Sequence, residues 1–454
     1  MKFIITLWLS KIAAFIVNLI APDRGSNYSG KVAVKLMPDF VKHFKGIDYE
    51  KVIFITGTNG KSSTNNLVGH TLSSAGRTVA SNIEGANMMT GVATTLIKNS
   101  TLGGYFNKEF LVLEIDERSL PLILKVLPAR HMGITNLQKD QVQRNGDLDF
   151  IFRKFKGAIT QDMTLYLNNE EPQSKALEDC AAKRVYFGVA PNSKTGNRSG
   201  EYHVTLPCPK CGHPIAYERY NLASIGTFHC THCSHSSQEM PDVWVDSVDF
   251  DGKTFTCEGE IYHVTYNTPF YIYNYAMDIA ICRHFGLTSE QIRRGFETFE
   301  NPNERREVLT YHGKQIHYLQ IKQENPETLQ SALDTIAEDA DPKAVLIGLY
   351  KIRDFDPYYT NTFYFYDCDF EPVARTEVEQ YVAFSTTVCY DIAMRMVYAG
   401  APEEKVTAID TDDAPTILAE LDKMHTDNIY FITNMKTYKT MRPYFTEGGA
   451  EDGR

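Results

Sequence analysis

A glycine-containing turn between a predicted strand and a predicted helix carries the clearest chemistry in the sequence. Residues 51–56 form an apolar, β-branched run that is typical of a buried strand, and residues 62–74 carry apolar side chains at helical spacing. The turn between them is Gly57-Thr58-Asn59-Gly60-Lys61-Ser62. Glycines let the backbone approach an anion closely, and the amide groups at a helix start point toward it. The turn therefore predicts a phosphate-binding loop.

The residue types in this loop suggest ATP as the ligand. Lys61 is expected to bridge the outer phosphates, and the Ser62 hydroxyl is expected to bind the Mg²⁺ that accompanies the nucleotide. The general phosphate-loop spacing places a glycine five residues before Gly60, but that position is Ile55. We therefore expect a shorter variant of the loop, with its nucleotide contacts at Gly57, Thr58, Asn59, Gly60, Lys61 and Ser62.

Two carboxylates stand at the end of a second predicted strand, residues 110–116. Glu114 and Asp116 should share one face, because side chains two apart on a strand point the same way. The carboxyl ends of parallel strands border the ligand crevice of an open sheet. Since carboxylate oxygens bind hard cations, Glu114 is the predicted ligand of a second metal or of magnesium-bound water. A solvated acidic pair is the alternative.

Four of the nine cysteines form two close pairs. The pairs C-P-K-C and C-T-H-C are separated by 18 residues, which is a zinc-site spacing. Four thiolates complete a tetrahedron and leave no position for water, so the predicted zinc is structural. A nearby histidine replacing one cysteine is the alternative. The predicted ligands are Cys208, Cys211, Cys230 and Cys233, and the alternative histidines are His229, His232 and His235.

Strand and helix signals alternate along most of the chain, which predicts an α/β fold with a mainly parallel sheet. A smaller Rossmann-like domain is expected from about residue 305, and the Gly-, Cys- and His-rich stretch at about 200–240 is expected as an inserted zinc ribbon. The domains that we expect are an N-terminal helical segment at 1–47, an ATP-binding domain at 48–304 and a C-terminal domain at 305–454. The other predicted strands are 131–136, 164–168, 345–349, 381–384, 406–409 and 428–432, and the other predicted helices are 120–127, 271–285, 292–299, 390–398 and 414–424.

The N-terminal residues 3–20 are strongly apolar but are interrupted by Ser10 and Lys11. About 20 largely uninterrupted apolar residues are needed to span a bilayer. We therefore expect a helix that packs on the protein or lies at a membrane surface, with a spanning helix or a cleaved signal as alternatives.

Charge and cysteine usage exclude some classes of protein. The net charge is −11 and no basic stripe is present, which argues against nucleic-acid binding. The five cysteines outside the two pairs are isolated, as is typical of buried thiols in a reducing compartment.

Two further groups are weaker candidates. Asn274 ends the run F-Y-I-Y-N, in which aromatic faces and an amide suit a purine, although the same pattern is also typical of a core helix. Several aspartates follow the predicted strand 345–349 and are as consistent with a solvated loop as with a site; they are Asp354, Asp356, Asp367 and Asp369.

Taken together, these motifs resemble the Mur ligase family. The resemblance is carried by TGTNGKSS at 56–63, N-I-E-G-A-N-M at 82–88, LEIDE at 113–117 and Thr135-Asn136. The four-cysteine insertion, the short segment before the loop and the small C-terminal domain resemble the MurT-type subunits of lipid II isoglutaminyl synthase in particular.

The resemblance implies an ATP-dependent ligase in a heterodimer, placed in the cytoplasm or at the inner face of the plasma membrane. MurT-type subunits phosphorylate the α-carboxylate of D-glutamate in the stem peptide of lipid II. A GatD-like glutaminase partner supplies ammonia, which displaces phosphate to form D-isoglutamine. By motif, Lys61, Ser62 and Glu114 would serve ATP and Mg²⁺, Asn274 would contact adenine, and Arg305 would correspond to the family's Gly-Arg arginine.

The sequence departs from the family in its C-terminal region. Counting back from the D-C-D-F-E segment at 367–371, the family's aspartate that supports the glutaminase triad aligns with Asn361. An asparagine cannot carry the charge that stabilises an imidazolium, so Asp356 or Asp354 would have to supply it. Two alternatives therefore remain open, namely a Mur-fold ligase for another carboxylate and a nucleotide-binding paralogue that acts as a scaffold.

Overall fold

The computed structural model describes residues 1–20, 27–82, 86–138, 148–196, 206–222, 224–301, 306–322, 325–349, 363–386 and 388–447. These residues form two compact units, the first running from the N-terminus to Asn301 and the second from Arg306 to Glu447. The loop and cysteine motifs both belong to the first unit.

The first unit is built on a nine-stranded sheet with the order β11-β10-β9-β6-β5-β4-β1-β3-β2. Neighbouring strands from β2 to β9 in this order pair in parallel, whereas β10 pairs antiparallel with β9 and with β11. The strands are β1 (Val52–Thr56), β2 (Val79–Ser81), β3 (Phe110–Glu114), β4 (His131–Ile134), β5 (Thr164–Asn168), β6 (Lys183–Val189), β9 (Val243–Asp249), β10 (Thr254–Cys257) and β11 (Glu260–His263).

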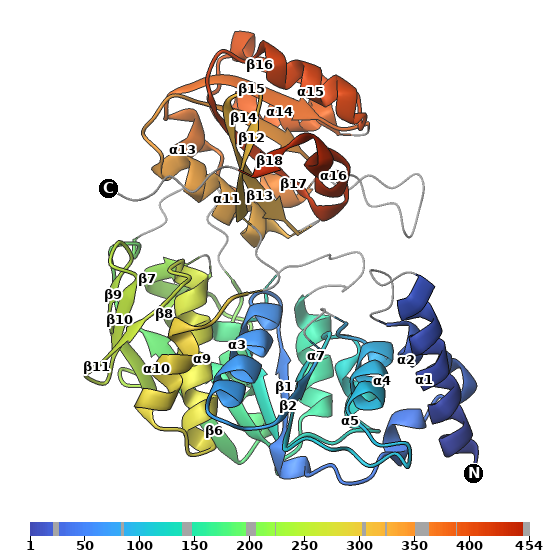
Figure 1. Ribbon diagram of the computed structural model, residues 1–454. Helices are drawn as coiled ribbons and strands as arrows, with labels where there is room; N and C mark the ends of the chain where they lie inside the picture. The colour runs from blue at the N-terminus through green and yellow to red at the C-terminus, as the bar shows by residue number, and fades with distance from the viewer. Residues whose placement is uncertain are drawn as a thin grey trace. The chain divides into compact units, whose positions relative to one another are not determined.

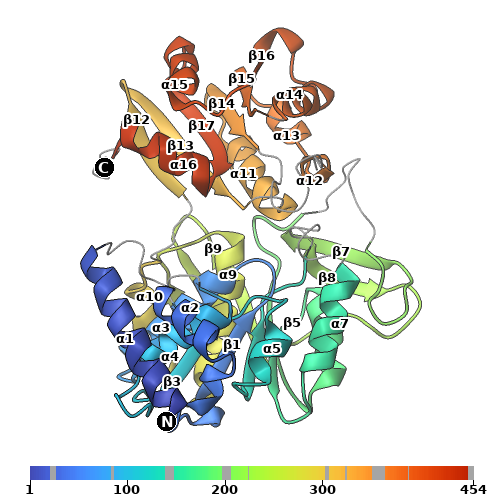
Figure 2. The same cartoon turned by 90° about the vertical axis from the view of Figure 1, so that its right-hand side faces the viewer.

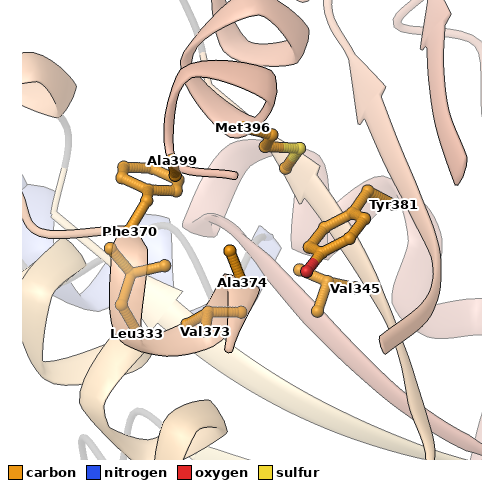
Figure 3. Close-up of a pocket in the computed structure, with 8 residues that line it drawn as sticks. All are labelled: Leu333, Val345, Phe370, Val373, Ala374, Tyr381, Met396 and Ala399. Atoms are coloured by element: carbon orange, nitrogen blue, oxygen red, sulfur yellow. The ribbon is translucent and has the colours of Figure 1, made fainter. Parts of the chain in front are cut away.

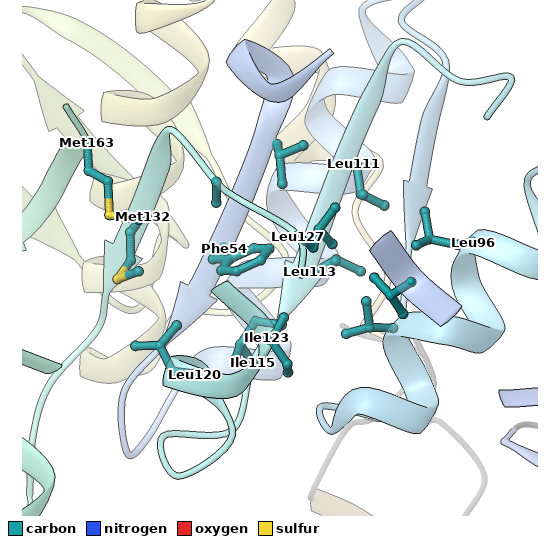
Figure 4. Close-up of a cluster of buried hydrophobic side chains, with 14 of the residues drawn as sticks. Phe54, Leu96, Leu111, Leu113, Ile115, Leu120, Ile123, Leu127, Met132 and Met163 are labelled. Carbon is teal, nitrogen blue, oxygen red and sulfur yellow. The ribbon is translucent and has the colours of Figure 1, made fainter. Parts of the chain in front are cut away.

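Helices cover both faces of this sheet, as Figures 1 and 2 show. Every residue of β1 and β3 is buried, because alternate side chains enter the two cores on either side. Phe54, Leu111 and Leu113 point into one core with Leu120 and Ile123 (Figure 4). The helices of the unit are α3 (Lys61–Ser74), α4 (Met89–Lys98), α5 (Leu120–Leu124), α7 (Leu148–Ala158), α8 (Pro172–Lys175), α9 (Pro269–His284) and α10 (Ser289–Glu297), with 3₁₀ turns η3 (Tyr49–Lys51) and η4 (Ala176–Cys180).

A separate two-stranded hairpin, β7 (Ile215–Leu222) and β8 (Ile225–Cys230), is inserted between β6 and β9. The predicted inserted module is thus confirmed as a hairpin. It carries its own small core of Ile215 and Phe228 packed against the four cysteines.

The N-terminal segment forms helices α1 (Lys2–Ile20) and α2 (Tyr28–Leu36) and the 3₁₀ turn η2 (Phe40–His43). Helix α1 packs against α2 and α4. Among the described residues, no helix is long and apolar enough to cross a membrane. The prediction that residues 3–20 form a helix packed on the protein is therefore consistent with the structure.

The second unit is built on a seven-stranded sheet with the order β16-β15-β14-β17-β13-β12-β18. The strands from β13 to β16 in this order pair in parallel, and β12 pairs antiparallel with β13 and β18. Its strands are β12 (Arg306–Tyr311), β13 (Lys314–Ile321), β14 (Lys343–Gly348), β15 (Val378–Phe384), β16 (Val406–Ile409), β17 (Asn428–Asn434) and β18 (Thr446–Glu447). Its helices are α11 (Pro326–Glu338), α12 (Phe363–Tyr366), α13 (Glu371–Ala374), α14 (Cys389–Tyr398), α15 (Ala414–Lys423) and α16 (Met435–Met441), with η5 (Glu403–Lys405) and η6 (Arg442–Tyr444).

The predicted α/β class is confirmed, with one difference. The central sheet is mixed, because β10 and β11 extend it antiparallel beyond the hairpin insertion. Strands β10 and β11 escaped prediction because each is only four residues long and lacks the apolar run of the central strands.

Candidate functional site

The predicted phosphate loop joins β1 to α3 at the carboxyl end of the sheet. Gly57 and Gly60 have φ angles of 120° and 83°, a region that side chains other than glycine rarely adopt. A Cβ on Gly60 would lie 2.7 Å from the Asn274 side chain, so the turn also needs glycine for space. The loop therefore has the tight backbone that close approach of an anion requires.

Polar residues after β4 hold the loop in place. The Thr58 amide donates to the Asn136 carbonyl at 2.8 Å, and the Asn59 amide donates to Asn136 Oδ1 at 2.9 Å. Asn59 Nδ2 also donates to Gln138 Oε1 at 2.9 Å. All these side chains are buried. A fully bonded buried network of this kind makes the loop rigid before any ligand binds.

Lys61 is buried and is bound by the protein itself. Its Nζ lies 2.7 Å from Glu117 Oε1, and it also donates to the carbonyls of Gly57 and Thr58. The side chains of Lys61 and Glu117 are only 7% and 6% exposed. Lys61 is thus positioned over the loop that it was predicted to serve, with a carboxylate as its present partner.

Glu117 escaped the sequence analysis. It lies three residues beyond Glu114 in the LEIDE run, and nothing in that run distinguishes which of its three acids faces the lysine. A usable signal was the rule that residues just beyond the carboxyl end of a parallel strand border the ligand crevice.

Ser62 and Glu114, the two predicted magnesium ligands, contact each other. Ser62 Oγ donates to Glu114 Oε2 at 2.7 Å, and Asn87 Nδ2 donates to Glu114 Oε1 at 2.8 Å. The side chain of Asn82 bonds both the amide and the carbonyl of Glu114, each at 2.8 Å. Glu114 is only 3% exposed, which excludes the alternative of a solvated acidic pair.

Asp116 behaves differently from the prediction. Strand β3 ends at Glu114, so Asp116 lies beyond it and does not share a strand face with Glu114. Its Oδ1 accepts from the amides of Arg118 and Ser119 at 3.0 and 3.3 Å. Asp116 therefore stabilises the turn before α5, because an aspartate side chain that accepts from amides two and three residues further on closes a turn.

Asn274 of α9 is buried and lies against Gly60 of the loop. Nearby, Tyr271 stacks on Tyr266 with ring centroids 4.7 Å apart, and Tyr271 OH accepts from Asn301 at 2.5 Å. Asn301 Nδ2 also lies 3.3 Å from Ser63 Oγ, in the first turn of α3. The structure thus brings the predicted residue to the loop, together with an aromatic pair.

These residues fit a nucleotide with its metal. The loop offers an anion a tight glycine backbone and the N-terminus of the 14-residue helix α3. Lys61 supplies positive charge, and the hydroxyl of Ser62 with the carboxylate of Glu114 supplies the oxygen ligands that Mg²⁺ prefers.

The four cysteines converge at the base of the β7–β8 hairpin. Their sulfur atoms all lie within 4.8 Å of one another, with Cys208 and Cys233 3.7 Å apart and Cys211 and Cys230 3.4 Å apart. A tetrahedral zinc site with ligands at about 2.3 Å needs sulfur separations of roughly 3.8 Å. The cluster therefore fits zinc.

Backbone groups support this assignment. The amides of His232 and Cys233 each point to Cys230 Sγ at 3.4 Å. Burial acts to raise the pKa of the Cys230 thiol, but these amides, together with the neighbouring thiols of Cys211 and Cys233, lower the pKa to about 6. Of the alternative histidines, His235 instead donates from Nε2 to the Pro172 carbonyl at 2.8 Å. Among these three described histidines, only His232 joins a possible cation-binding group, which it forms with Cys211 and His213.

The hairpin is connected to the phosphate loop. Gln138, which binds Asn59 of the loop, donates from Nε2 to Ser224 Oγ in the hairpin turn at 3.0 Å. Gly226 of β8 donates its amide to the Glu170 carbonyl at 2.9 Å. The cysteine module thus contacts the phosphate loop through the side chain of Gln138.

Glu170 is a second residue that the sequence analysis missed. It follows β5 in the polar run N-N-E-E, which looks like a surface turn, yet it is 1% exposed. It accepts from Tyr273 OH at 2.7 Å, from the Val189 amide at 2.8 Å and from Asn221 at 3.1 Å. Burial raises the pKa of Glu170 and these hydrogen bonds lower it; burial has the larger effect, and the resulting pKa is about 7. It ties the hairpin and α9 to the sheet.

In the second unit, Arg395 of α14 holds the D-C-D-F-E segment. The buried guanidinium donates to both oxygens of Glu371 at 3.0 Å and to the Cys368 carbonyl at 2.7 Å. Burial raises the pKa of Glu371, but Arg395 outweighs it and holds the pKa at about 2. Arg305, Asp354, Asp356 and Asn361 lie outside the described residues.

The second unit also contains a small apolar pocket (Figure 3). It is lined by residues of α11, α13, α14, β14 and β15, and its surface is apolar throughout. Binding sites usually combine apolar walls with several placed polar groups. This pocket is therefore a packing void of the core. Its lining residues are Leu333, Val345, Phe370, Val373, Ala374, Tyr381, Met396 and Ala399.

Comparison with known proteins agrees with this geometry. Residues 55–205 match the Mur ligase middle domain, and residues 323–441 match the MurT ligase C-terminal domain. The chain belongs to the Mur ligase family of ATP-dependent ligases.

Within this family the chain is MurT-like. It is 28% identical over 367 residues, covering 80% of each chain, to the MurT subunit of lipid II isoglutaminyl synthase from Staphylococcus aureus strain COL. It is 27% identical over 427 residues to the Streptococcus pneumoniae R6 MurT subunit, covering 92% of this chain and 91% of that one. A pseudomurein peptide ligase type C from Methanothermus fervidus shares the fold, with a TM-score of 0.66 at 18% identity over 90% of this chain and 80% of that chain.

Proposed function

We propose that this chain is the synthetase subunit of a lipid II isoglutaminyl synthase. It would use ATP to activate the α-carboxylate of D-glutamate in the lipid II stem peptide for amidation to D-isoglutamine. The observation that carries the proposal is a phosphate loop with Lys61 and a Ser62–Glu114 pair, in a chain that resembles MurT subunits through both units.

The chemistry has two steps. A carboxylate oxygen of the substrate attacks the γ-phosphorus of ATP and ADP leaves, which gives an acyl phosphate. Ammonia then attacks the acyl carbon, and phosphate leaves as the amide forms. The first step is needed because a carboxylate resists attack by an amine, whereas phosphate is a good leaving group. Stabilising the charge on the transferred phosphoryl group is the main task of such a site.

The residues of the loop divide this task. The backbone of residues 57–60 and the N-terminus of α3 would bind the phosphates, and Lys61 would neutralise their developing charge. Ser62 and Glu114 would hold Mg²⁺, which supplies further charge neutralisation, and Asn87 would orient the carboxylate. Asn274, against Gly60, would contact the adenine nucleotide.

Lys61 must exchange partners to act. Its contact with Glu117 occupies a donor that the phosphates would need. We infer that nucleotide competes with Glu117 for Lys61, so that the carboxylate holds the lysine in place until the phosphates arrive.

The assignments in the C-terminal region rest on resemblance to the family. Asn361 would align with the family aspartate that faces the catalytic histidine of a GatD-like glutaminase, and Asp356 or Asp354 would supply the charge that Asn361 lacks. Arg305 would belong to the nucleotide site. The domain limits would be 48–304 for ATP binding and 305–454 for the C-terminal domain. The complex would be cytoplasmic, at the inner face of the plasma membrane where lipid II is made.

A reconstituted reaction tests the proposal. Chain, cognate glutaminase, ATP, glutamine and lipid II should yield an amidated stem peptide and ADP, and Lys61→Ala should abolish both products. If another carboxylate substrate stimulates ATP turnover while lipid II does not, the chain is a different Mur-fold ligase. If ATP binds and no acceptor stimulates its hydrolysis, the chain is a nucleotide-binding scaffold, a role that the loss of charge at Asn361 would suit.

A further inference from the structure

Helix α1 presents apolar side chains to solvent along one complete face. Seven large apolar residues on this helix are between 47% and 76% exposed. They recur every three or four positions, so they form one continuous stripe along the helix. The stripe consists of Ile5, Trp8, Leu9, Ile12, Phe15, Ile16 and Leu19.

Three polar residues within α1 face the protein instead. Thr6 and Ser10 are 3% and 0% exposed, and Lys11 donates from Nζ to the carbonyls of Ile97 and Ser100 at 2.6 and 2.8 Å. A surface helix of a globular protein has the opposite arrangement, with its apolar face inward. The orientation of α1 is therefore inverted.

Packing fixes this orientation. Leu7 is fully buried, and the Phe3 ring contacts Phe40 in a tilted arrangement and Phe44 edge to face, each with ring centroids 5.2 Å apart. Trp8 donates its indole N–H to the Leu102 carbonyl at 2.9 Å while its ring remains half exposed. Figures 1 and 2 both show α1 at the periphery of the first unit, alongside α2.

The exposed area is too large to be incidental. Seven half- to three-quarters-exposed side chains, continued by Leu102 at 63%, exceed the roughly 300–600 Å² of the largest apolar patch on a typical monomer. An exposed apolar patch of this size is typical of a surface that binds a membrane or another protein.

The charge around α1 identifies what covers it. Residues 1–47 contain seven lysines and arginines and two aspartates, a net charge of +5 in a chain whose total is −11. Lys2, Lys31, Lys35 and Lys42 are exposed. Two copies meeting through α1 would bring these positive segments together, which is unfavourable, whereas anionic headgroups would attract them.

We propose that the α1 stripe is a docking surface for an anionic lipid bilayer. The helix lies in the interface with Ile12, Phe15 and Leu19 among the acyl chains, with Trp8 at headgroup level and the lysines on the phosphates. Among the described residues, no helix is both long and apolar enough to cross a membrane. The inference does not depend on the proposed reaction, but it would bring the ATP site to a membrane-linked substrate.

Vesicle binding of the full-length protein tests this inference. Wild type should co-float with vesicles containing phosphatidylglycerol and should bind phosphatidylcholine vesicles far more weakly. The double variant Ile12→Glu with Phe15→Glu should lose at least tenfold in affinity. A matched control, Leu122→Glu with Met240→Glu, changes residues that are 62% and 72% exposed elsewhere and should bind as wild type does.

A second pair of variants leaves the apolar stripe intact. Lys31→Gln and Lys35→Gln should each weaken binding to anionic vesicles roughly fivefold. Unchanged nucleotide binding would show that every variant is folded. The proposal would be overturned if wild type does not bind anionic vesicles, or if the double variant Ile12→Glu with Phe15→Glu binds them as tightly as the control does. A concentration-dependent dimer of wild type that Phe15→Glu dissociates would also overturn the proposal. It would show that a second copy of this chain, and not a bilayer, covers the α1 stripe. Because no ATP or lipid II is present, these outcomes are separate from those of the amidation assay.

Discussion

Replacing Glu117 with glutamine should remove the ion pair between Glu117 and Lys61 of the phosphate loop and destabilise the fold. The Lys61–Glu117 pair is 2.7 Å long and both side chains are almost fully buried. Breaking such a pair by removing one charge typically costs about 3–5 kcal/mol, since the other charge stays buried without compensation. Lys61 keeps its bonds to the Gly57 and Thr58 carbonyls, so we expect the lower end, about 3 kcal/mol.

This cost should depend on the nucleotide. If phosphates replace Glu117 as the partner of Lys61, saturating ATP analogue should remove most of the stability difference between Glu117→Gln and wild type. By linkage, the variant should then bind nucleotide more tightly than wild type. Urea unfolding with and without a non-hydrolysable ATP analogue, together with calorimetric titration, measures both quantities.

A matched control is Glu109→Gln. Glu109 also pairs with a lysine, Lys51, at 3.0 Å, and with Arg77 at 3.2 Å. These side chains are 28–43% exposed, so each pair should be worth at most about 1 kcal/mol. Its effect should be the same with and without nucleotide. Equal destabilisation of Glu117→Gln in both conditions, or weaker nucleotide binding, would refute the idea that Glu117 and phosphate compete for Lys61.

Three further changes probe the metal sites and the core. Asn87→Ala should lower the apparent affinity for Mg²⁺ in ATP turnover about 10- to 100-fold, because Asn87 orients Glu114. A magnesium titration with an unchanged midpoint would contradict this role. Cys230→Ser should lower zinc content by elemental analysis, and should also weaken nucleotide binding, because the hairpin reaches the loop through Gln138; full zinc retention would exclude the four-cysteine site. Burial raises the pKa of Glu170 from 4.5 to about 7, so the folded state binds this proton more tightly than the unfolded state does. The folded state therefore loses stability as pH rises from about 4.5 to about 7, and the loss levels off above that pH. Urea unfolding at pH 5 and 8 should therefore show Glu170→Gln gaining roughly 3 kcal/mol on wild type at the higher pH, and a pH-independent difference would argue against a buried, titrating Glu170.

Local patterns were sufficient to predict part of the site. The strand–glycine turn–helix signal located the loop, and two C-x-x-C pairs located the cysteine cluster, because in both cases the chemistry depends on residues close in sequence. The Ser62–Glu114 contact joins residues 52 positions apart, yet it could be predicted because both residues end or begin elements at the same edge of the sheet.

Other features depend on three-dimensional contacts that no local pattern reveals. Glu117 and Glu170 are buried carboxylates, whereas acidic residues in polar runs are usually exposed. Their partners lie far away along the chain, at Lys61, Asn221 and Tyr273. The inverted orientation of α1 is a further case, since an apolar segment alone does not show which face the protein covers.

Isotope transfer in the reconstituted reaction tests the central claim most directly. Lipid II whose D-glutamate α-carboxylate carries ¹⁸O would be incubated with the chain, its glutaminase partner, ATP and glutamine. Activation as an acyl phosphate predicts that one ¹⁸O appears in the released inorganic phosphate as the amide forms, and that Lys61→Ala gives neither product. Amidated lipid II accompanied by phosphate that contains no ¹⁸O would contradict the account.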